Sequence, residues 1–322
     1  EKFSETTYPE MLIALAKLHQ ESCEGIIIDL RGNTGGYMDQ AIHMVNEFLP
    51  KEKLIVYTEG RKFPRRDYLS NGTGSSQQLP IIVLIDEGSA SASEIFAGAI
   101  QDNDRGTIVG RRSFGKGLVQ EPIEFSDGSA IRLTIARYHT PSGRCIQRPY
   151  ENGKDEHYNL DWVERYEKGE FFSEDSIKQD QSHIYYTSLG RPVYGGGGIM
   201  PDIFVPIDTT KATTFHINCN KKATAMRFAS AMFDKYRNTL TKISSFDQLQ
   251  TYLSGLSLDR QFLDYAAKVD GFTPKPGEWE QTREYMMPQI YGLVGRFSKV
   301  GEEAFYRFYL PIDETIKVAI EQ

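Results

Sequence analysis

The 322-residue chain has no long apolar run, and this excludes a helix that spans a membrane. Its longest uninterrupted apolar stretch is Met11–Ala16, six residues, whereas a span needs about 20. Hydrophobic residues still make up 39% of the chain, which is enough to bury a core and too high for a disordered protein. No signal-peptide or lipidation motif is recognisable and the chain starts at Glu1, so we expect a processed or shortened product.

Basic residues are in deficit, with 37 Lys and Arg against 44 Asp and Glu, a net charge of −7. This balance argues against nucleic acid as the main partner, because phosphate binding needs a basic face. Cysteine is scarce as well: Cys23, Cys145 and Cys219 are too few and too far apart for a disulfide framework or a zinc site. We expect three structural thiols, with a single bridge left open.

Strand and helix patterns alternate over residues 1–150, which predicts an α/β domain with a largely buried sheet. The predicted strands are 25–30, 53–57, 81–85, 107–109 and 130–138, and the predicted helices are one capped by Thr7-x-x-Glu10, then 41–49 and 91–103. Residues 59–79 carry turn formers without periodicity and are predicted to be a long loop.

The second half of the chain changes character. Residues 151–190 predict an irregular surface excursion with a short helix, and residues from about 221 onward are helical in pattern. One later helix is predicted to start at the cap Ser245-x-x-Gln248, and another to end at Gly271. At roughly 150 residues per domain the length fits two domains, and we place them at 1–207 and 208–322.

The densest chemical signal is Asp86-Glu-Gly-Ser-Ala-Ser-Ala-Ser-Glu94, small residues between a strand and a helix. A serine in the first turn of a helix lies where unpaired N–H groups and the positive dipole end collect, and these stabilise an oxyanion. Ser91 is therefore a candidate nucleophile. The alternative is that Ser91-x-x-Glu94 only caps the helix.

A serine nucleophile needs a base, and none of the six histidines stands in a recognisable motif; the pattern G-x-S-x-G is absent too. A lysine can serve once burial lowers its pKa by about 3 units from near 10.4, roughly 4 kcal/mol. The candidate is Lys116 in Gly110-Arg-Arg-Ser-Phe-Gly-Lys-Gly117, a loop after a strand. The alternative is a surface lysine in a glycine turn.

The same segment mimics a phosphate-binding loop, G-x-x-x-x-G-K. Gly117 stands where a Ser or Thr should hold Mg²⁺, and the residues that follow are not helical in pattern, so nucleotide binding is the weaker alternative. Asp29-Leu-Arg-Gly-Asn-Thr-Gly-Gly36 predicts a turn whose amides can point inward, or a plain turn. By themselves, His139–Arg144 predicts a turn and Gly195–Gly198 a turn or hinge.

Taken in order, these segments and Gly190–Ile199 resemble the C-terminal processing peptidases, or tail-specific proteases, over roughly residues 1–207. The resemblance implies a ClpP/crotonase-like α/β core with a Ser–Lys dyad, Ser91 as nucleophile and Lys116 as general base. The remaining implied site residues are Gln120, which orients the lysine; Ala92 with Gly35 or Gly36, which form the oxyanion hole; and the supporting residues Ser113, Glu94 and Asp102.

The resemblance also implies a function: cleavage of flexible or unfolded polypeptides near their C-termini, in the periplasm or cell envelope, without a metal or cofactor. Family members usually carry an upstream PDZ domain, so we expect one before Glu1 in the parent protein, and an oligomer is possible. Residues 208–322 resemble the helical extensions of larger bacterial members. The alternative from another class is a non-catalytic peptide-binding scaffold on the same fold.

Overall fold

The structure is a computed structural model that describes residues 2–150, 155–178 and 182–322, and side chains within 155–159 lie outside that description. The chain divides into two compact units, Glu1–Pro206 and Ile207–Gln322. Each unit has a hydrophobic core of its own. The mixed α/β character of the first unit and the helical character of the second confirm those parts of the prediction.

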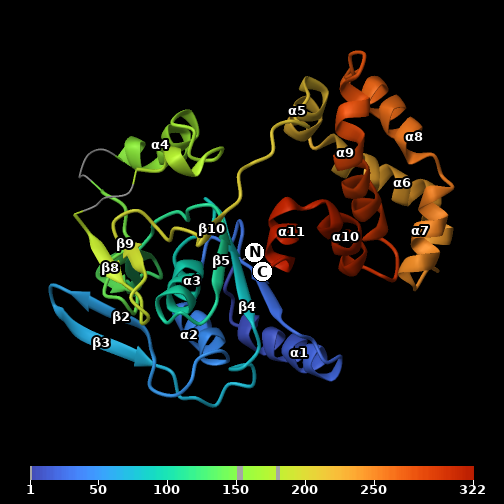
Figure 1. Cartoon of the computed structure of the whole chain (residues 1–322). Helices are drawn as coiled ribbons and strands as arrows, with labels where there is room; N and C mark the ends of the chain where they lie inside the picture. The colour runs from blue at the N-terminus through green and yellow to red at the C-terminus, as the bar shows by residue number, and fades with distance from the viewer. Residues whose placement is uncertain (1, 151–154, 179–181) are drawn as a thin grey trace. The chain divides into compact units, whose positions relative to one another are not determined.

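The first unit contains a four-stranded parallel sheet in the order β1-β4-β5-β10 (Figure 1). Its strands are β1 (Ile26–Asp29), β4 (Ile81–Ile85), β5 (Thr107–Gly110) and β10 (Ile203–Phe204). The helices of this part are α1 (Thr7–Gln20), α2 (Met38–Asn46) and α3 (Ala92–Asp102). Because strands of a parallel sheet end at one edge, the turn after β1, the turn after β4 and the loop after β5 meet there.

A second sheet is antiparallel, in the order β3-β2-β7-β6, and consists of β2 (Leu54–Gly60), β3 (Phe63–Leu69), β6 (Leu118–Glu124) and β7 (Ala130–His139). β3 corrects the prediction of a loop over residues 59–79. Tyr68 is its one half-buried residue and the other six are exposed, so no alternation of apolar and polar residues marks the strand. A short hairpin, β8 (Ile184–Tyr186) and β9 (Pro192–Tyr194), stands apart from both sheets.

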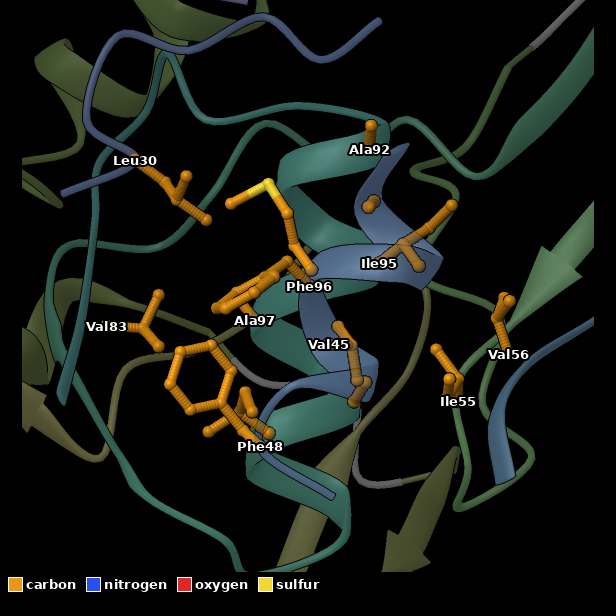
Figure 2. Packing of buried hydrophobic residues seen from close by; sticks show 14 of the residues in the cluster. Leu30, Val45, Phe48, Ile55, Val56, Val83, Ala92, Ile95, Phe96 and Ala97 are labelled. Atoms are coloured by element: carbon orange, nitrogen blue, oxygen red, sulfur yellow. The ribbon is translucent and has the colours of Figure 1, made fainter. Parts of the chain in front are cut away.

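Helix α3 lies at the centre of this unit. It packs against β5 of the first sheet and β2 of the second, and all of its residues are buried. Figure 2 shows the surrounding core, in which the rings of Phe48 and Phe96 meet edge to face with centroids 6.0 Å apart. Full burial of such a side chain stabilises the fold by roughly 1.5–3 kcal/mol. The start of α3, where Ser91 stands, is thus fixed by a rigid core.

One predicted helix cap is wrong and two helix boundaries are confirmed. Helix α1 begins at Thr7 with Thr6 as its cap residue, and the Thr7 hydroxyl accepts the Ser4 amide at 2.9 Å, so Thr7-x-x-Glu10 is not a capping box. Ser245 does cap its helix, because its hydroxyl accepts the Gln248 amide at 3.4 Å. Gly271 ends another helical segment with a φ of 73°.

The excursion is better ordered than predicted: α4 (Asp155–Glu167) is followed by the 3₁₀ turn η1 (Glu174–Ser176). Residues 151–154 and 179–181 of the predicted excursion lie outside the described residues.

The second unit is built from helices alone among its described residues. They are α5 (Thr214–Lys221), α6 (Thr224–Leu240), α7 (Phe246–Ser254), α8 (Leu258–Tyr265), η2 (Ala266–Asp270), α9 (Glu278–Gly295), α10 (Glu302–Tyr309), η3 (Leu310–Ile312) and α11 (Glu314–Ile320). The predicted aromatic stripes lie in its core, where Phe228 meets Phe262 edge to face. Over the described part of the chain, no helix is long and apolar enough to span a bilayer.

Candidate active site

Ser91 stands at the junction between the loop after β4 and the first turn of α3, and its backbone is strained. Its φ and ψ are 56° and −112°, a combination that a residue with a Cβ rarely adopts and that costs roughly 1–3 kcal/mol. An ordinary N-cap residue has extended dihedrals, so capping alone does not account for this conformation. The strain favours a chemical role for the turn that carries Ser91, which is itself half-buried.

Glu94, in the first turn of α3, links Ser91 to the loop that carries Lys116. One carboxylate oxygen accepts the amides of Ser91 and Lys116, each at 2.8 Å. The other accepts the Gly115 amide at 2.6 Å and the Ser113 hydroxyl at 2.5 Å. Four donors from two segments therefore converge on one side chain, which holds the two expected catalytic residues in a fixed backbone relationship.

The carboxylate of Glu94 is completely buried. Burial raises the pKa of Glu94 above its usual range, and the hydrogen bonds from Ser113, Lys116, Gly115 and Ser91 act in the opposite direction. A buried carboxylate of this kind is costly unless its acceptors are satisfied. Glu94 is thus committed to the architecture of the site and is enclosed away from solvent.

Lys116 is half-buried and follows Gly115, whose φ of 87° suits glycine. A Cβ at Gly115 would lie 3.1 Å from the Gly198 amide nitrogen, so the glycine segment 195–198 packs directly against this loop. On the other side of the lysine, the Gly117 amide donates to the Gln147 side chain at 2.9 Å. The loop is held at both ends, unlike a free surface turn.

Tyr138 is a site residue that the sequence reasoning missed. Its side chain is buried on β7, and its hydroxyl lies 3.0 Å from the Ser91 carbonyl oxygen and also contacts the Lys116 carbonyl oxygen. Tyr138 thus forms a second bridge between the expected nucleophile and the expected base. An aromatic residue in an alternating strand pattern predicts core packing, and no motif marked this one.

The turn after β1 packs against Ser91. A Cβ at Gly35 would lie 2.7 Å from the Ser91 Cβ and 2.9 Å from the Ala92 amide nitrogen. The Gly35 amide donates to the Asn33 side chain at 3.0 Å, whereas no acceptor is recorded for the amides of Gly36 and Ala92 among the residues that the structure describes. Of the expected oxyanion-hole donors, Ala92 and Gly36 therefore have their N–H groups available.

Gln120 lies on β6 and is exposed. Its side-chain amide donates to the Thr134 hydroxyl of the neighbouring strand at 3.4 Å. The recorded hydrogen bond of Gln120 is thus to β7, and its expected role in orienting Lys116 stays a prediction.

Two expected supporting residues have different surroundings. Ser113 is fully buried in the site: beyond its bond to Glu94, its hydroxyl accepts the Ile199 amide at 2.7 Å. Asp102 lies at the opposite end of α3 from Ser91, where it pairs with the buried Arg144 at 2.7 Å and accepts the Ser142 hydroxyl at 2.7 Å. Asp102 therefore anchors the turn at 140–144 rather than lining the site.

The structure bears on the alternatives too. Lys116 is followed by the strand β6 and not by a helix, so the helix N-terminus that a phosphate-binding loop requires is missing from this segment. Cys23, Cys145 and Cys219 are all free thiols. Within the described residues, no cluster of three or more His, Cys, Asp or Glu side chains is arranged to hold a metal ion.

Comparison with known proteins finds similarity to proteases over the part of the chain that carries this site. Residues 1–157 match the model of peptidase family S41. The chain is 43% identical over 147 residues to a carboxyl-terminal-processing protease of Synechocystis sp., and 46% identical over 151 residues to a carboxy-terminal-processing protease of Bartonella bacilliformis. These alignments cover 46% and 45% of this chain and 34% and 35% of the relatives, so the chain spans about a third of their length.

Among solved structures, a photosystem II D1 C-terminal processing protease aligns with 65% of this chain and 42% of its own, at 26% identity and a TM-score of 0.46. The family match over residues 1–157 covers the segments that hold Ser91, Glu94 and Lys116, and the two curated relatives bear names of the same kind of protease. They confirm the resemblance inferred from the motifs: residues 1–157 match peptidase family S41, and about 150 residues of the chain are similar to carboxyl-terminal-processing proteases.

Proposed function

We propose that this chain is the peptidase core of a C-terminal processing serine endopeptidase, with a ClpP/crotonase-like core and a Ser91–Lys116 dyad. The observation that carries the proposal is the hydrogen-bonded cross-link through Glu94, in which one carboxylate oxygen accepts the backbone amides of both Ser91 and Lys116. A structural glycine turn has no need of a buried carboxylate that joins it to a strained serine on another segment. Residues 207–322 form a helical extension.

The chemistry follows from the positions of these groups. Lys116 in its neutral form takes the proton of the Ser91 hydroxyl as the oxygen attacks the substrate carbonyl carbon. Negative charge then develops on the carbonyl oxygen, and the Ala92 and Gly36 amides are the candidates to stabilise it, helped by the dipole of α3. The lysine returns the proton to the leaving amine, and the acyl-enzyme that forms on Ser91 is hydrolysed by the reverse use of the same groups.

The substrate proposal rests on the relatives. Their names specify processing at the carboxyl terminus, and we extend this to flexible or unfolded tails. Action in the periplasm or cell envelope, an upstream PDZ domain in the longer parent and an oligomeric assembly belong to the same proposal. The competing function is a non-catalytic scaffold that binds peptides through the same site.

The test is cleavage of an unstructured polypeptide, read by intact mass, with a free and with an amidated C-terminus. Loss of cleavage in Ser91→Ala and Lys116→Met, together with a preference for the free terminus, is the expected result. Labelling of Ser91 by a serine-reactive probe provides a second readout that needs no knowledge of the substrate. Cleavage that persists in Ser91→Ala, or peptide binding without any labelling of Ser91, would favour the scaffold.

A further inference from the structure

Helix α4 of the excursion has an inverted arrangement of side chains. Its apolar residues Leu160, Trp162 and Tyr166 are more than half exposed, while Arg165 on the same helix is 3% exposed. Burying an arginine is costly unless its donors are used, so a helix that turns an arginine inward does so for a specific contact. Most of this helix, from residue 158 to residue 167, lies beyond the segment that matches the family model, which ends at residue 157.

The contact is with the loop that leads to Lys116. Arg165 donates from one terminal nitrogen to the Ser113 carbonyl oxygen at 3.1 Å and from the other to the Arg112 carbonyl oxygen at 2.6 Å. The planar guanidinium presents its donors in a rigid fork, so two consecutive carbonyls fix both the position and the orientation of the peptide between them. Ser113 in turn donates its hydroxyl to Glu94.

A second arginine joins α4 to the same loop. The Arg148 amide donates to the Gly115 carbonyl at 3.0 Å, its guanidinium stacks 3.8 Å above the Phe114 ring, and it pairs with Asp161 of α4 at 2.6 Å. α4 therefore supports the loop directly through Arg165 and indirectly through Asp161.

A carboxylate of the excursion itself compensates the positive charges of this cluster. Glu170, just after α4, pairs with Arg112 at 2.6 Å and with Arg165 at 3.2 Å. Burial, and next the charge of Arg112, lower the pKa of Arg165 to about 10, so the guanidinium stays charged at neutral pH. A charged donor makes stronger hydrogen bonds to the loop carbonyls than a neutral one would.

We propose that Arg165 is a positioning residue: α4 acts as a strut that holds residues 112–115 and thereby sets where Lys116 stands relative to Ser91. The proposal rests on the dyad proposed above. It assigns the excursion a role in the chemical step rather than in substrate contact.

The first test is hydrogen exchange in the 322-residue chain, which needs no catalytic activity. The amides of Gly115 and Lys116 donate to Glu94, so their exchange reports whether the loop stays in place. Arg165→Met is expected to speed exchange in 111–117 by about tenfold or more, by raising the population of the open loop. Lys168→Met, which removes an exposed pair with Glu164 on the same helix, leaves it unchanged.

The second test is steady-state cleavage. Arg165→Met is expected to lower kcat by about 10- to 100-fold with little change in KM, because a displacement of about 1 Å is enough for such a loss. Arg165→Lys is expected to restore part of the rate, because its single ammonium nitrogen can reach one of the two carbonyls but lacks the fork that holds both. The assay is run at a temperature at which Arg165→Met is folded. A wild-type kcat in this variant, or a change in KM alone, would overturn the proposal.

If Arg165→Met does not fold, Asp161→Asn tests the second arm, because it removes the pairing charge from Arg148 at nearly constant volume. Faster exchange in 111–117 supports the strut, and unchanged exchange in this variant contradicts it. A wild-type chain without Ser91-dependent cleavage would refute the proposed function, while the exchange result would still decide the strut.

Discussion

The Tyr138 hydroxyl lies 3.0 Å from the Ser91 carbonyl oxygen and also contacts the Lys116 carbonyl oxygen. One phenol on β7 thus bridges the main chain of two residues that are 25 positions apart in the sequence. Glu94 bridges the same two residues through their amides. The backbone of the proposed dyad is therefore clamped from both its N–H and its C=O groups.

Tyr138→Phe is expected to separate the two carbonyls while keeping the ring in the core. Loss of a buried hydroxyl that serves two acceptors costs about 1–3 kcal/mol, and we expect kcat to fall about tenfold or more at similar KM. Tyr57→Phe is the matched control, since Tyr57 is also buried on this sheet and the hydrogen bond of its hydroxyl within the described part of the chain is to the Gly143 carbonyl, at 3.4 Å. Equal losses in the two variants, measured as kcat in the cleavage assay, would contradict a role specific to Tyr138.

Glu94→Gln is expected to preserve the volume of the side chain and to break part of the cross-link, because an amide NH₂ replaces an oxygen that accepts N–H groups. We expect the cleavage rate to fall about 100-fold, as for other displacements within a catalytic site. The exposed Glu121→Gln variant on β6 is the control and should keep the wild-type rate. A Glu94→Gln variant with full activity would show that the cross-link is dispensable.

The same variant tests the pKa of Glu94 through stability. Burial raises the pKa of Glu94 in the folded protein above its value in the unfolded chain. The Glu94 carboxyl therefore contributes most to the free energy of unfolding below the ordinary carboxyl pKa, and this contribution is lost as pH rises through the folded value. Urea unfolding of wild type and Glu94→Gln is measured from about pH 4, near that ordinary value, up to about pH 8. The free energy of unfolding of the wild type should exceed that of the variant by an amount that shrinks as pH rises. An advantage that grows with pH would mean that the pKa is lowered instead.

Sequence reasoning predicted the two residues of the proposed dyad but not the contacts that support them. Ser91 and Lys116 stand in short motifs with local signatures, a small-residue turn before a helix and a lysine between glycines, and the structure joins their two segments through Glu94. Tyr138 and Arg165 act by touching main-chain carbonyls of distant segments, and such contacts leave no local pattern. Glu94 was visible only as half of a helix cap, because its bonds to Gly115 and Lys116 require the tertiary fold.

The fold was predicted on the same basis. The strands β1 and β4 were predicted correctly because short runs of isoleucine and valine are typical of strands in a buried sheet. The edge strand β3 was missed because it buries almost nothing, and because the turn formers of residues 59–79, Pro64 among them, favoured a loop. Local propensity fails where pairing with a neighbouring strand alone decides the structure.

The second unit should lose stability in mild acid because of His216. Burial lowers the pKa of His216, whose Nδ1 is buried without a hydrogen-bond partner among the described residues, so the folded unit favours the neutral ring. That stability is present above the unfolded value of about 6.5 and is lost as pH falls through the lowered folded value. Hydrogen exchange of α5 between pH 7 and 5, corrected for intrinsic rates, should show this loss. His216→Gln should reduce it, and a wild-type profile in that variant would contradict the assignment.

Gly35→Ala is expected to inactivate the site through the nucleophile rather than through the fold as a whole. The added methyl would lie 2.6 Å from the Ala90 carbonyl oxygen and 2.7 Å from the Ser91 Cβ, so the turn that carries Ser91 must move. The φ of 93° at Gly35 adds backbone strain to this clash. Gly32 also has a positive φ, 64°, but a Cβ added there would have open space around it. Gly32→Ala therefore controls for strain alone, at a cost of about 1–2 kcal/mol.

Labelling by a serine-reactive probe separates the two glycine variants. We expect Gly35→Ala to lower the labelling rate of Ser91 by about 100-fold, in line with the cost of displacing a reacting group, and Gly32→Ala to leave it within about twofold. Thermal unfolding of both variants checks that each is folded at the assay temperature. Equal labelling in Gly35→Ala and wild type would mean that the turn after β1 does not govern the position of Ser91, and the Gly36 amide would then lose its place in the proposed oxyanion hole.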